Sequence, residues 1–225
     1  MAALLARTIA GFGFLLLVMG LVVFGAAGTT GYWQGWAVIG VFAGCSGLIT
    51  VWLWGHDKAL LERRVKAGPG AESDPMQNIV QALAGIVFLA TFAVPGLDHR
   101  LGWSKVPIAV VVAGDVLVAL GFWVVFLVFR ENSFTSGTIE LAEGQTVIDT
   151  GPYAILRHPM YAGALLMFVG LPLAMGSWWG LAAAAGIAPI LIWRLLLEEK
   201  FLLSNLAGYD AYRRRVTRRL IPLVW

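Results

Sequence analysis

The residues best suited to chemistry form the sequence RHPMY at positions 157–161. Pro159 has no backbone N–H group to donate and suits the first turn of a helix, so we expect His158 at the start of a helix. The free N–H groups and the dipole at such an end attract an anion, and Arg157 adds a positive charge. The pattern therefore indicates a place for the carboxylate or phosphate of a ligand, with basic residues at a membrane surface as the ordinary alternative.

A second polar group consists of Arg194, Glu198 and Glu199. Arg194 and Glu198 are one helical turn apart and share a face, an arrangement that most often forms a surface ion pair. A tight turn links this helix to the one that starts near Pro159, so we expect both polar groups at the same end of the two helices. Together they suit a zwitterionic amino-acid ligand, with the helix start and His158 for its carboxylate and a glutamate for its ammonium group.

Other polar residues give weaker indications. Asp115 lies inside an apolar run, where a carboxylate is functional by default but can also bond to a neighbouring helix. The three histidines, His56, His99 and His158, show no HxxxH spacing and the chain has no CxxC, so we predict no metal site. The single cysteine, Cys45, cannot form an intrachain disulfide. The basic residues form no broad patch, so nucleic acid is not an expected partner.

The elements that position these residues are membrane helices, as the composition requires. Apolar residues make up 59% of the chain and charged residues only 13%. A soluble domain has about 25% charged residues. A soluble chain of this length could not bury so much apolar surface, whereas a lipid bilayer can cover it.

The charge-free runs divide the chain into spans. One span needs about 20 apolar residues, and the run from Thr8 to Gly55 is long enough for two, which the sequence GTTG at 28–31 would separate. A later charge-free run, 160–193, is divided near Pro172 into two short helices. We therefore predict an all-α integral membrane protein with five to six transmembrane helices. The expected spans lie at 8–27, 32–55, 76–97, 106–129 and, as the two short helices, within 160–193.

Lysine and arginine lie almost entirely on one side of these spans. Of the 16 basic residues, all but Arg100 and Lys105 belong to the N-terminus, to the loops 55–75 and 130–157, or to the tail with Arg194 at a helix end. Cytoplasmic loops of membrane proteins carry this excess of positive charge. We therefore predict that both termini are cytoplasmic.

The tail, 198–225, is basic and amphipathic. Apolar residues recur there at spacings of three and four, and most of the arginines fall off that stripe. This pattern predicts an amphipathic interfacial helix on the anionic cytoplasmic leaflet, in which Gly208 is a potential break. The stripe consists of Leu202, Leu206, Tyr209, Tyr212, Val216 and Leu220.

The polar groups also resemble a known family. The sequences GPYAILRHPMYAG, WRLLLEE, GYDAYRRRV and RLIP occur in that order within residues 130–225. They resemble the isoprenylcysteine carboxyl methyltransferase family and its prokaryotic relatives, which show G-x-Y, RHPxYxG, a Glu-Glu pair and a Tyr-x-x-Tyr tail. On this resemblance, residues 1–129 form an N-terminal four-helix transmembrane region, and residues 130–225 form the catalytic region that binds S-adenosylmethionine (SAM).

The resemblance implies specific site residues. Arg194 resembles the arginine that faces the methyl acceptor, so it is the candidate catalytic residue. Glu198, or Glu199 if the alignment shifts by one residue, resembles the acidic cofactor ligand. The chain departs from the family at Met160, where a small residue is common. The cofactor-binding residues implied are Gln145, Thr146, Val147, Ile148, Tyr153, His158, Pro159, Met160, Tyr161, Glu198 and Glu199.

The implied function is transfer of a methyl group from SAM to a lipophilic or other small-molecule acceptor, such as the carboxylate of an isoprenoid-like or other lipid. The site would face the cytoplasm from a bacterial inner membrane, with the lipid bilayer as partner. Two alternatives remain open: an NADPH-dependent membrane reductase of the sterol reductase type, and a non-catalytic membrane protein on the same scaffold. The sequence does not indicate an oligomeric state.

Overall fold

The computed structural model of the chain describes residues 2–65, 72 and 74–221. These residues contain helices and no strand, which confirms the predicted all-α class. Residues 222–225 of the predicted tail helix and Lys66 of the predicted 55–75 loop lie outside the described residues. The helices are α1 (Ala2–Ala27), α2 (Trp33–His56), α3 (Lys58–Val65), α4 (Pro75–Leu101), α5 (Ile108–Glu131), the 3-10 helix η1 (Gly151–Ala154), α6 (Pro159–Ala174), α7 (Trp179–Ala185), α8 (Ile187–Asn205) and α9 (Tyr209–Arg215).

Five helical segments in the described part of the chain are long and apolar enough to cross a bilayer. They are α1, α2, α4, α5 and the combined α7 and α8, while α6 is apolar but shorter, with 16 residues. The predicted membrane-protein class is therefore confirmed, and the exact number of spans stays a prediction. The last one is longer than expected, because strong helix formers after Arg194 continue the helix to Asn205.

Close helix packing at glycine holds α5 against α6. A Cβ atom added to Gly121 would lie 2.6 Å from the carbonyl oxygen of Gly163, and one added to Gly170 would lie 2.7 Å from that of Gly114. Both pairs therefore need glycine, as is common where membrane helices approach closely. This packing fixes the start of α6, and with it the RHPMY sequence, beside the end of α5.

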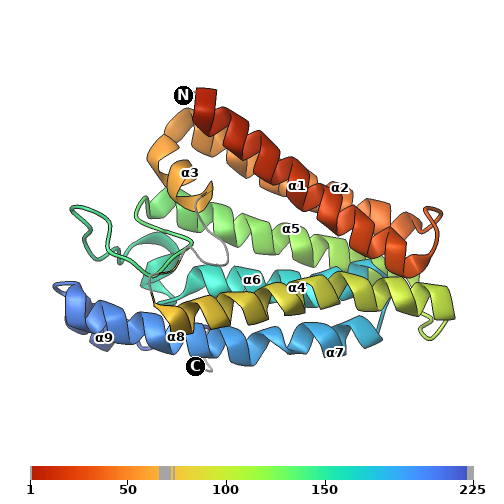
Figure 1. The fold of residues 1–225 in the computed structure, drawn as a ribbon. Helices are drawn as coiled ribbons and strands as arrows, with labels where there is room; N and C mark the ends of the chain where they lie inside the picture. Colours follow the sequence, from red (N-terminus) through yellow and green to blue (C-terminus); the bar gives the residue numbers. More distant parts are fainter. Residues whose placement is uncertain (1, 66–71, 73, 222–225) are drawn as a thin grey trace.

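Helices α1 and α4 are close at one end only. A Cβ atom on Gly96 of α4 would lie 2.7 Å from the carbonyl oxygen of Val23 in α1, so the backbones almost touch there. From that contact the two helices diverge toward the end where α1 begins and α9 lies (Figure 1). The start of α1 and the end of α9 thus lie toward the same end of the bundle, as the predicted topology requires. Which side of the membrane this end faces stays a prediction.

The tail is helical for only part of its predicted length. Helix α8 ends at Asn205, and Gly208, with φ +84° in a left-handed conformation, directly precedes α9, so the predicted break is present. Helix α9 ends at Arg215, and the following residues instead pair with the segment before α6. The backbone N–H groups of Arg157 and His158 donate to the carbonyl oxygens of Arg218 and Arg219, at 2.9 and 3.0 Å.

The apolar stripe of the tail packs on protein rather than lying free on its surface. Tyr209, Tyr212 and Val216 are all buried, against partly buried side chains of α8 and of residues 147 and 153. The stripe was therefore correctly identified as a face that must be covered. The stripe is covered by α8 and by the loop between α5 and α6, and contact of the basic face of the tail with the lipid leaflet stays a prediction.

The predicted 55–75 loop contains a helix as well. Helix α3 begins directly after α2, where the carboxylate of Asp57 accepts a hydrogen bond from the N–H of Leu60 at 2.8 Å. Leu60 and Leu61 are buried against the ends of α2 and α5. This packing places Arg63 and Arg64 against the α5–η1 loop (residues 132–150), where they donate to the carbonyl oxygens of Ser133 and Ser136.

Candidate functional site

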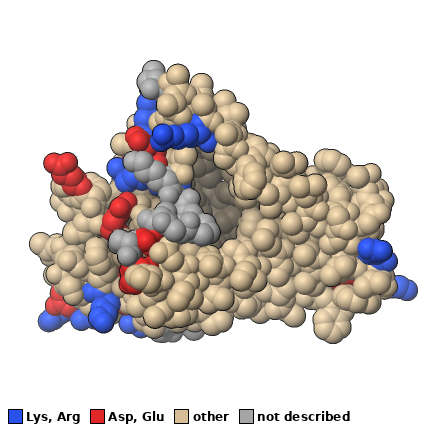
Figure 2. All heavy atoms as spheres, viewed as in Figure 1, with Lys and Arg blue, Asp and Glu red and all other residues tan. Residues whose placement is uncertain are grey.

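A cavity of about 910 Å³ lies where α1 and α4 diverge. It is also bounded by α2, α3, α5, α6, α8 and the α5–η1 loop. Figure 2 shows a hollow in the surface between the ridge that contains α1 and the body of the molecule below it. The polar end of the cavity is lined by Arg64, Tyr153, His158, Tyr161, Arg194 and Glu198, and the apolar part by Phe12, Leu15, Ile49, Leu53, Ala84, Gly85 and Phe122.

Most of the predicted site residues line this cavity. Residues far apart in the sequence meet there because the α5–η1 loop folds across the starts of α6 and α9. Glu199 is the one predicted residue that is absent from the lining, and Asp115 on α5 is remote from it. The predicted residues on the lining are Gln145, Thr146, Val147, Ile148, Tyr153, His158, Pro159, Met160, Tyr161, Arg194 and Glu198.

The carboxylate of Glu199 is already paired with cationic side chains of the protein itself. Arg157 Nε donates to Glu199 Oε1 at 2.7 Å, and Arg219 Nε donates to Oε2 at 3.1 Å. His158 Nε2 lies 3.3 Å from the same Oε1. Glu199 is buried, so this carboxylate ties the start of α6 to the tail rather than facing the cavity.

Arg157, the partner of Glu199, also connects the start of α6 to the tail. Besides Glu199, its guanidinium donates to the carbonyl oxygens of Val216 at 3.0 Å and Thr217 at 3.2 Å. A buried arginine with its donors used in this way holds the tail against the start of α6. The sequence had suggested that Arg157 attracts a ligand anion, but its charge is already neutralised by Glu199.

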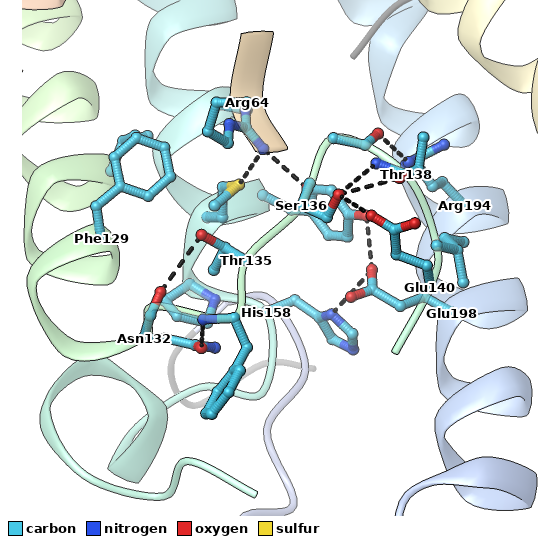
Figure 3. A pocket seen from close by; sticks show the side chains of 18 of the residues that line it. Arg64, Phe129, Asn132, Thr135, Ser136, Thr138, Glu140, His158, Arg194 and Glu198 are labelled. Atoms are coloured by element: carbon cyan, nitrogen blue, oxygen red, sulfur yellow. Dashed lines mark hydrogen bonds and ion pairs between the residues drawn. The ribbon is translucent and has the colours of Figure 1, made fainter. Parts of the chain in front are cut away.

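Glu198, one residue earlier, faces the cavity. Tyr161 Oη donates to Glu198 Oε2 at 2.6 Å, and His158 Nδ1 lies 3.9 Å from the same oxygen (Figure 3). The other carboxylate oxygen, Oε1, has no hydrogen-bond partner within the described chain, and the side chain is 30% exposed. Glu198 therefore presents one free acceptor to the cavity, held in place by a tyrosine and a histidine.

The aromatic rings around Glu198 also order the site. The rings of His158 and Tyr161 stack with centroids 5.6 Å apart and an interplanar angle of 15°. Because both ring nitrogens of His158 face glutamates, the contacts of this histidine favour a role in orienting Glu198 over direct binding of an anion.

Arg194 lines the cavity but already has an acidic partner. Its Nη2 donates to Glu72 Oε1 at 2.8 Å and to the carbonyl oxygen of Gly137 at 2.9 Å. Nη1 donates to Gln77 Oε1 at 3.2 Å. The side chain of Glu72 is only 1% exposed, and its other oxygen accepts the N–H of Ile139 at 3.0 Å. Arg194 and Glu72 thus hold the α5–η1 loop over the polar end of the cavity.

Arg64 of α3 is a cavity residue that the sequence did not reveal. Its Nη1 donates to the carbonyl oxygen of Ser136 at 2.9 Å, and its guanidinium lies 5.2 Å from the ring centroid of Phe129 (Figure 3). Burial lowers the pKa of the Arg64 guanidinium. No sequence pattern distinguishes Arg64 from the exposed cations near it, because only the packing of α3 turns it inward.

Tyr209 and Tyr212 of α9 also line the cavity. Tyr212 Oη donates to the carbonyl oxygen of Tyr153 at 2.8 Å, whereas the hydroxyl of Tyr209 is buried with no hydrogen-bond partner among the described residues. Burial raises the pKa of both phenols, so both are protonated donors near neutral pH. The sequence had placed both tyrosines on the apolar stripe, and the family's Tyr-x-x-Tyr pattern was the available signal for them.

Comparison with known proteins agrees with this geometry. Residues 109–207 match the phospholipid methyltransferase family, which includes the membrane methyltransferases like isoprenylcysteine carboxyl methyltransferase. No curated protein matches the chain. The match covers just under half of the chain, from α5 through α8, and leaves out α1, α2 and α4, which contribute most of the apolar part of the cavity. It confirms the resemblance seen in the sequence and, with the long apolar helices, indicates a membrane methyltransferase.

Proposed function

We propose that this chain is a SAM-dependent methyltransferase that acts on a lipophilic acceptor, such as the carboxylate of an isoprenoid-like or other lipid. The observation that carries the proposal is the position of Glu198 at the polar end of a large cavity, with one carboxylate oxygen available. A carboxylate aimed at a cavity suits the ammonium group of an amino-acid ligand, since charge-assisted hydrogen bonds are strong.

The residues around the cavity fit such a ligand. Within the described residues, the hydroxyl of Tyr209 and one oxygen of Glu198 are a donor and an acceptor without a hydrogen-bond partner. A buried polar group normally has a partner, so the Tyr209 hydroxyl favours a bound ligand, and the open oxygen of Glu198 can pair with the same ligand. SAM, when bound, supplies a methyl group activated by a sulfonium. We expect Glu198, Tyr209, Met160 and residues 145–148 to hold it, with His158 and Tyr161 fixing Glu198.

The apolar part of the cavity supports a lipophilic acceptor. Gly11 of α1 and Gly85 of α4 are exposed and also line the cavity, so the cavity opens sideways between these two helices. In a bilayer this opening would face lipid. An acyl or prenyl chain could then lie along α1, α2 and α4, with its reactive group at the polar end and water excluded by the α5–η1 loop.

We propose for Arg194 a positioning role. Its bonds to Glu72 and Gly137 support a function in holding the α5–η1 loop across the polar end of the cavity. A well-positioned acceptor gains rate through proximity, so loss of this contact would lower turnover even if Arg194 never touches the acceptor.

The predicted cytoplasmic orientation in a bacterial inner membrane belongs to the same proposal, because SAM is made in the cytoplasm. Glu143 is exposed in the α5–η1 loop and suits a topology test. In a Cys45→Ser background, Glu143→Cys should react with a membrane-impermeant thiol reagent in inside-out vesicles but not in right-side-out vesicles. The reverse labelling would contradict the orientation.

The test of the function is calorimetric titration of the detergent-purified protein with S-adenosylhomocysteine, the demethylated product of SAM, and in parallel with NADPH. We expect saturable binding of S-adenosylhomocysteine and no binding of NADPH. Binding of NADPH alone would favour the reductase, and binding of neither by a folded sample would favour a non-catalytic protein.

A matched pair of variants ties the result to the site. Glu198→Gln should weaken the binding of S-adenosylhomocysteine about tenfold or more, because a charge-assisted hydrogen bond is lost. Glu143→Gln removes an exposed carboxylate that lies off the cavity lining and should leave the affinity unchanged. Equal effects of the two substitutions would count against the proposed site.

A further inference from the structure

The arginines at the polar end of the cavity differ in whether they are neutralised. Arg157 is paired with Glu199 at 2.7 Å, and Arg194 is paired with Glu72 at 2.8 Å. Arg64 has no carboxylate within ion-pair distance among the described residues; its guanidinium contacts a carbonyl oxygen, a thioether sulfur and an aromatic face. The polar end of the cavity therefore contains a cation whose charge is not balanced by an acidic side chain of the described chain.

The guanidinium of Arg64 also keeps donors available. Of its nitrogen atoms, Nη1 donates to Ser136, and neither Nε nor Nη2 has a hydrogen-bond partner within the part of the chain that the structure describes. Arg64 lines the cavity, and its pKa is lowered by burial and by the nearby charge of Arg194. A guanidinium with free N–H groups in a partly buried place favours a carboxylate or phosphate, to which it can donate two parallel bonds.

The position of Arg64 links the two parts of the cavity. Helix α3 packs through Leu61 on Leu53 of α2, and both of these leucines line the cavity. Arg64 follows Leu61 by one turn and lies over Phe129 at the boundary with the polar end (Figure 3). A molecule with an acidic group on Arg64 would therefore have its apolar chain directed toward α1 and α2.

We infer that Arg64 binds the acidic group of the lipophilic methyl acceptor, a carboxylate or a phosphate, while the chain of the acceptor lies along the apolar part of the cavity. This inference rests on the proposed function for the identity of the ligand as an acceptor. Helix α3, which provides Arg64, lies outside the region matched by the methyltransferase family.

The experiment measures binding of radiolabelled single-chain lipids to the purified protein in nonionic detergent by scintillation proximity. The probes are oleate for a carboxylate, lysophosphatidate for a phosphate, and oleyl alcohol as the uncharged match. We expect at least one acidic probe to bind more tightly than the alcohol, and the tighter of the two identifies the acidic group. Arg64→Gln should weaken the binding of that acidic probe about tenfold or more and leave the affinity for oleyl alcohol unchanged.

Arg63→Gln is the matched control. Arg63 is the adjacent cation on α3, donates to the carbonyl oxygen of Ser133 and is absent from the cavity lining, so its loss should leave all three affinities unchanged. Arg64→Lys keeps the charge and should retain part of the preference for the acidic probe, which separates loss of charge from loss of fold. Equal binding of acid and alcohol, or equal effects of Arg63→Gln and Arg64→Gln, would overturn the inference.

Titration with S-adenosylhomocysteine distinguishes the acceptor from the cofactor. We expect Arg64→Gln to change this affinity less than twofold. A large loss would overturn the inference and assign Arg64 to the carboxylate of the cofactor. If the wild-type protein binds no S-adenosylhomocysteine, the proposed function fails, whereas the comparison of oleate with oleyl alcohol still tests Arg64 as an anion ligand.

Discussion

Arg157 and Glu199 form an ion pair of 2.7 Å in which both side chains are only 5% exposed. The pair joins the start of α6 to the end of α8. Arg157 also donates hydrogen bonds to backbone carbonyl oxygens of the tail. Glu198, the neighbour of Glu199, instead faces the cavity beside Tyr161. Two adjacent glutamates thus have separate surroundings: Glu199 is in an internal ion pair, and Glu198 faces the cavity, where we propose that it binds the ligand.

Glu199→Gln should destabilise the protein and Glu198→Gln should not. Removing one partner of a buried ion pair costs about 3–5 kcal/mol because the other charge stays buried and unpaired. Thermal unfolding in detergent, followed by tryptophan fluorescence, should therefore show a clearly lower midpoint for Glu199→Gln only. A normal midpoint for Glu199→Gln combined with lost S-adenosylhomocysteine binding would reverse the two assignments.

The two tyrosines of α9 should also differ in the effect of their substitution: loss of the Tyr209 hydroxyl should affect ligand binding, and loss of the Tyr212 hydroxyl should affect stability. Tyr209→Phe removes a hydroxyl that has no hydrogen-bond partner among the described residues, and it should lower S-adenosylhomocysteine affinity by about 1 kcal/mol, or about fivefold, with an unchanged unfolding midpoint. Tyr212→Phe removes the bond to Tyr153 and should lower the midpoint instead. Calorimetry and thermal unfolding on both variants check this. Unchanged affinity for Tyr209→Phe would remove that hydroxyl from the site.

Arg194 and Glu72 should be energetically coupled. Arg194→Gln and Glu72→Gln each break the same largely buried ion pair, so each should destabilise the protein by about 3 kcal/mol. The double variant should lose clearly less than the sum, since the second substitution removes a charge that the first left unpaired. Additive losses in a double-mutant cycle would show that the pair does not hold the loop.

Arg194→Gln should leave S-adenosylhomocysteine binding unchanged and lower turnover, because Arg194 donates to Glu72, Gln77 and Gly137 rather than to Glu198, Tyr209 or residues 145–148. Single-turnover rates alongside calorimetry test this division. Loss of cofactor binding would mean that Arg194 contributes to the cofactor pocket directly.

Gly121→Ala should disturb helix packing, and Gly85→Ala should not. A Cβ atom on Gly121 would lie 2.6 Å from the backbone oxygen of Gly163, so α5 and α6 must move apart, at a cost of about 1–3 kcal/mol. A Cβ atom on Gly85 meets nothing within 4 Å, so that variant should keep or slightly raise its unfolding midpoint. Similar midpoints for the two variants would contradict the close packing of α5 on α6.

The sequence alone determined the membrane class, the approximate spans and most residues of the polar end of the cavity, with the exception of Arg64 and the choice between Glu198 and Glu199. Apolar runs of sufficient length must form helices in lipid, because unpaired backbone groups are too costly there. The RHPMY sequence also predicted its own helix start, since Pro159 can occupy only a few positions in a helix. These features depend only on which residues follow one another in the sequence, so they can be predicted without knowledge of the tertiary structure.

Tertiary packing decided the rest. Adjacent residues such as Glu198 and Glu199 point about 100° apart on a helix, and only the neighbouring elements determine which of them meets a cavity. The stripe that ends at Val216 requires an apolar partner, but its spacing is the same whether lipid or protein covers it. Arg64 looked like one more cytoplasmic cation until the packing of Leu60 and Leu61 turned it toward the cavity. Which partner a side chain meets is set by long-range contacts, and these are not encoded in the spacing of the residues that make them.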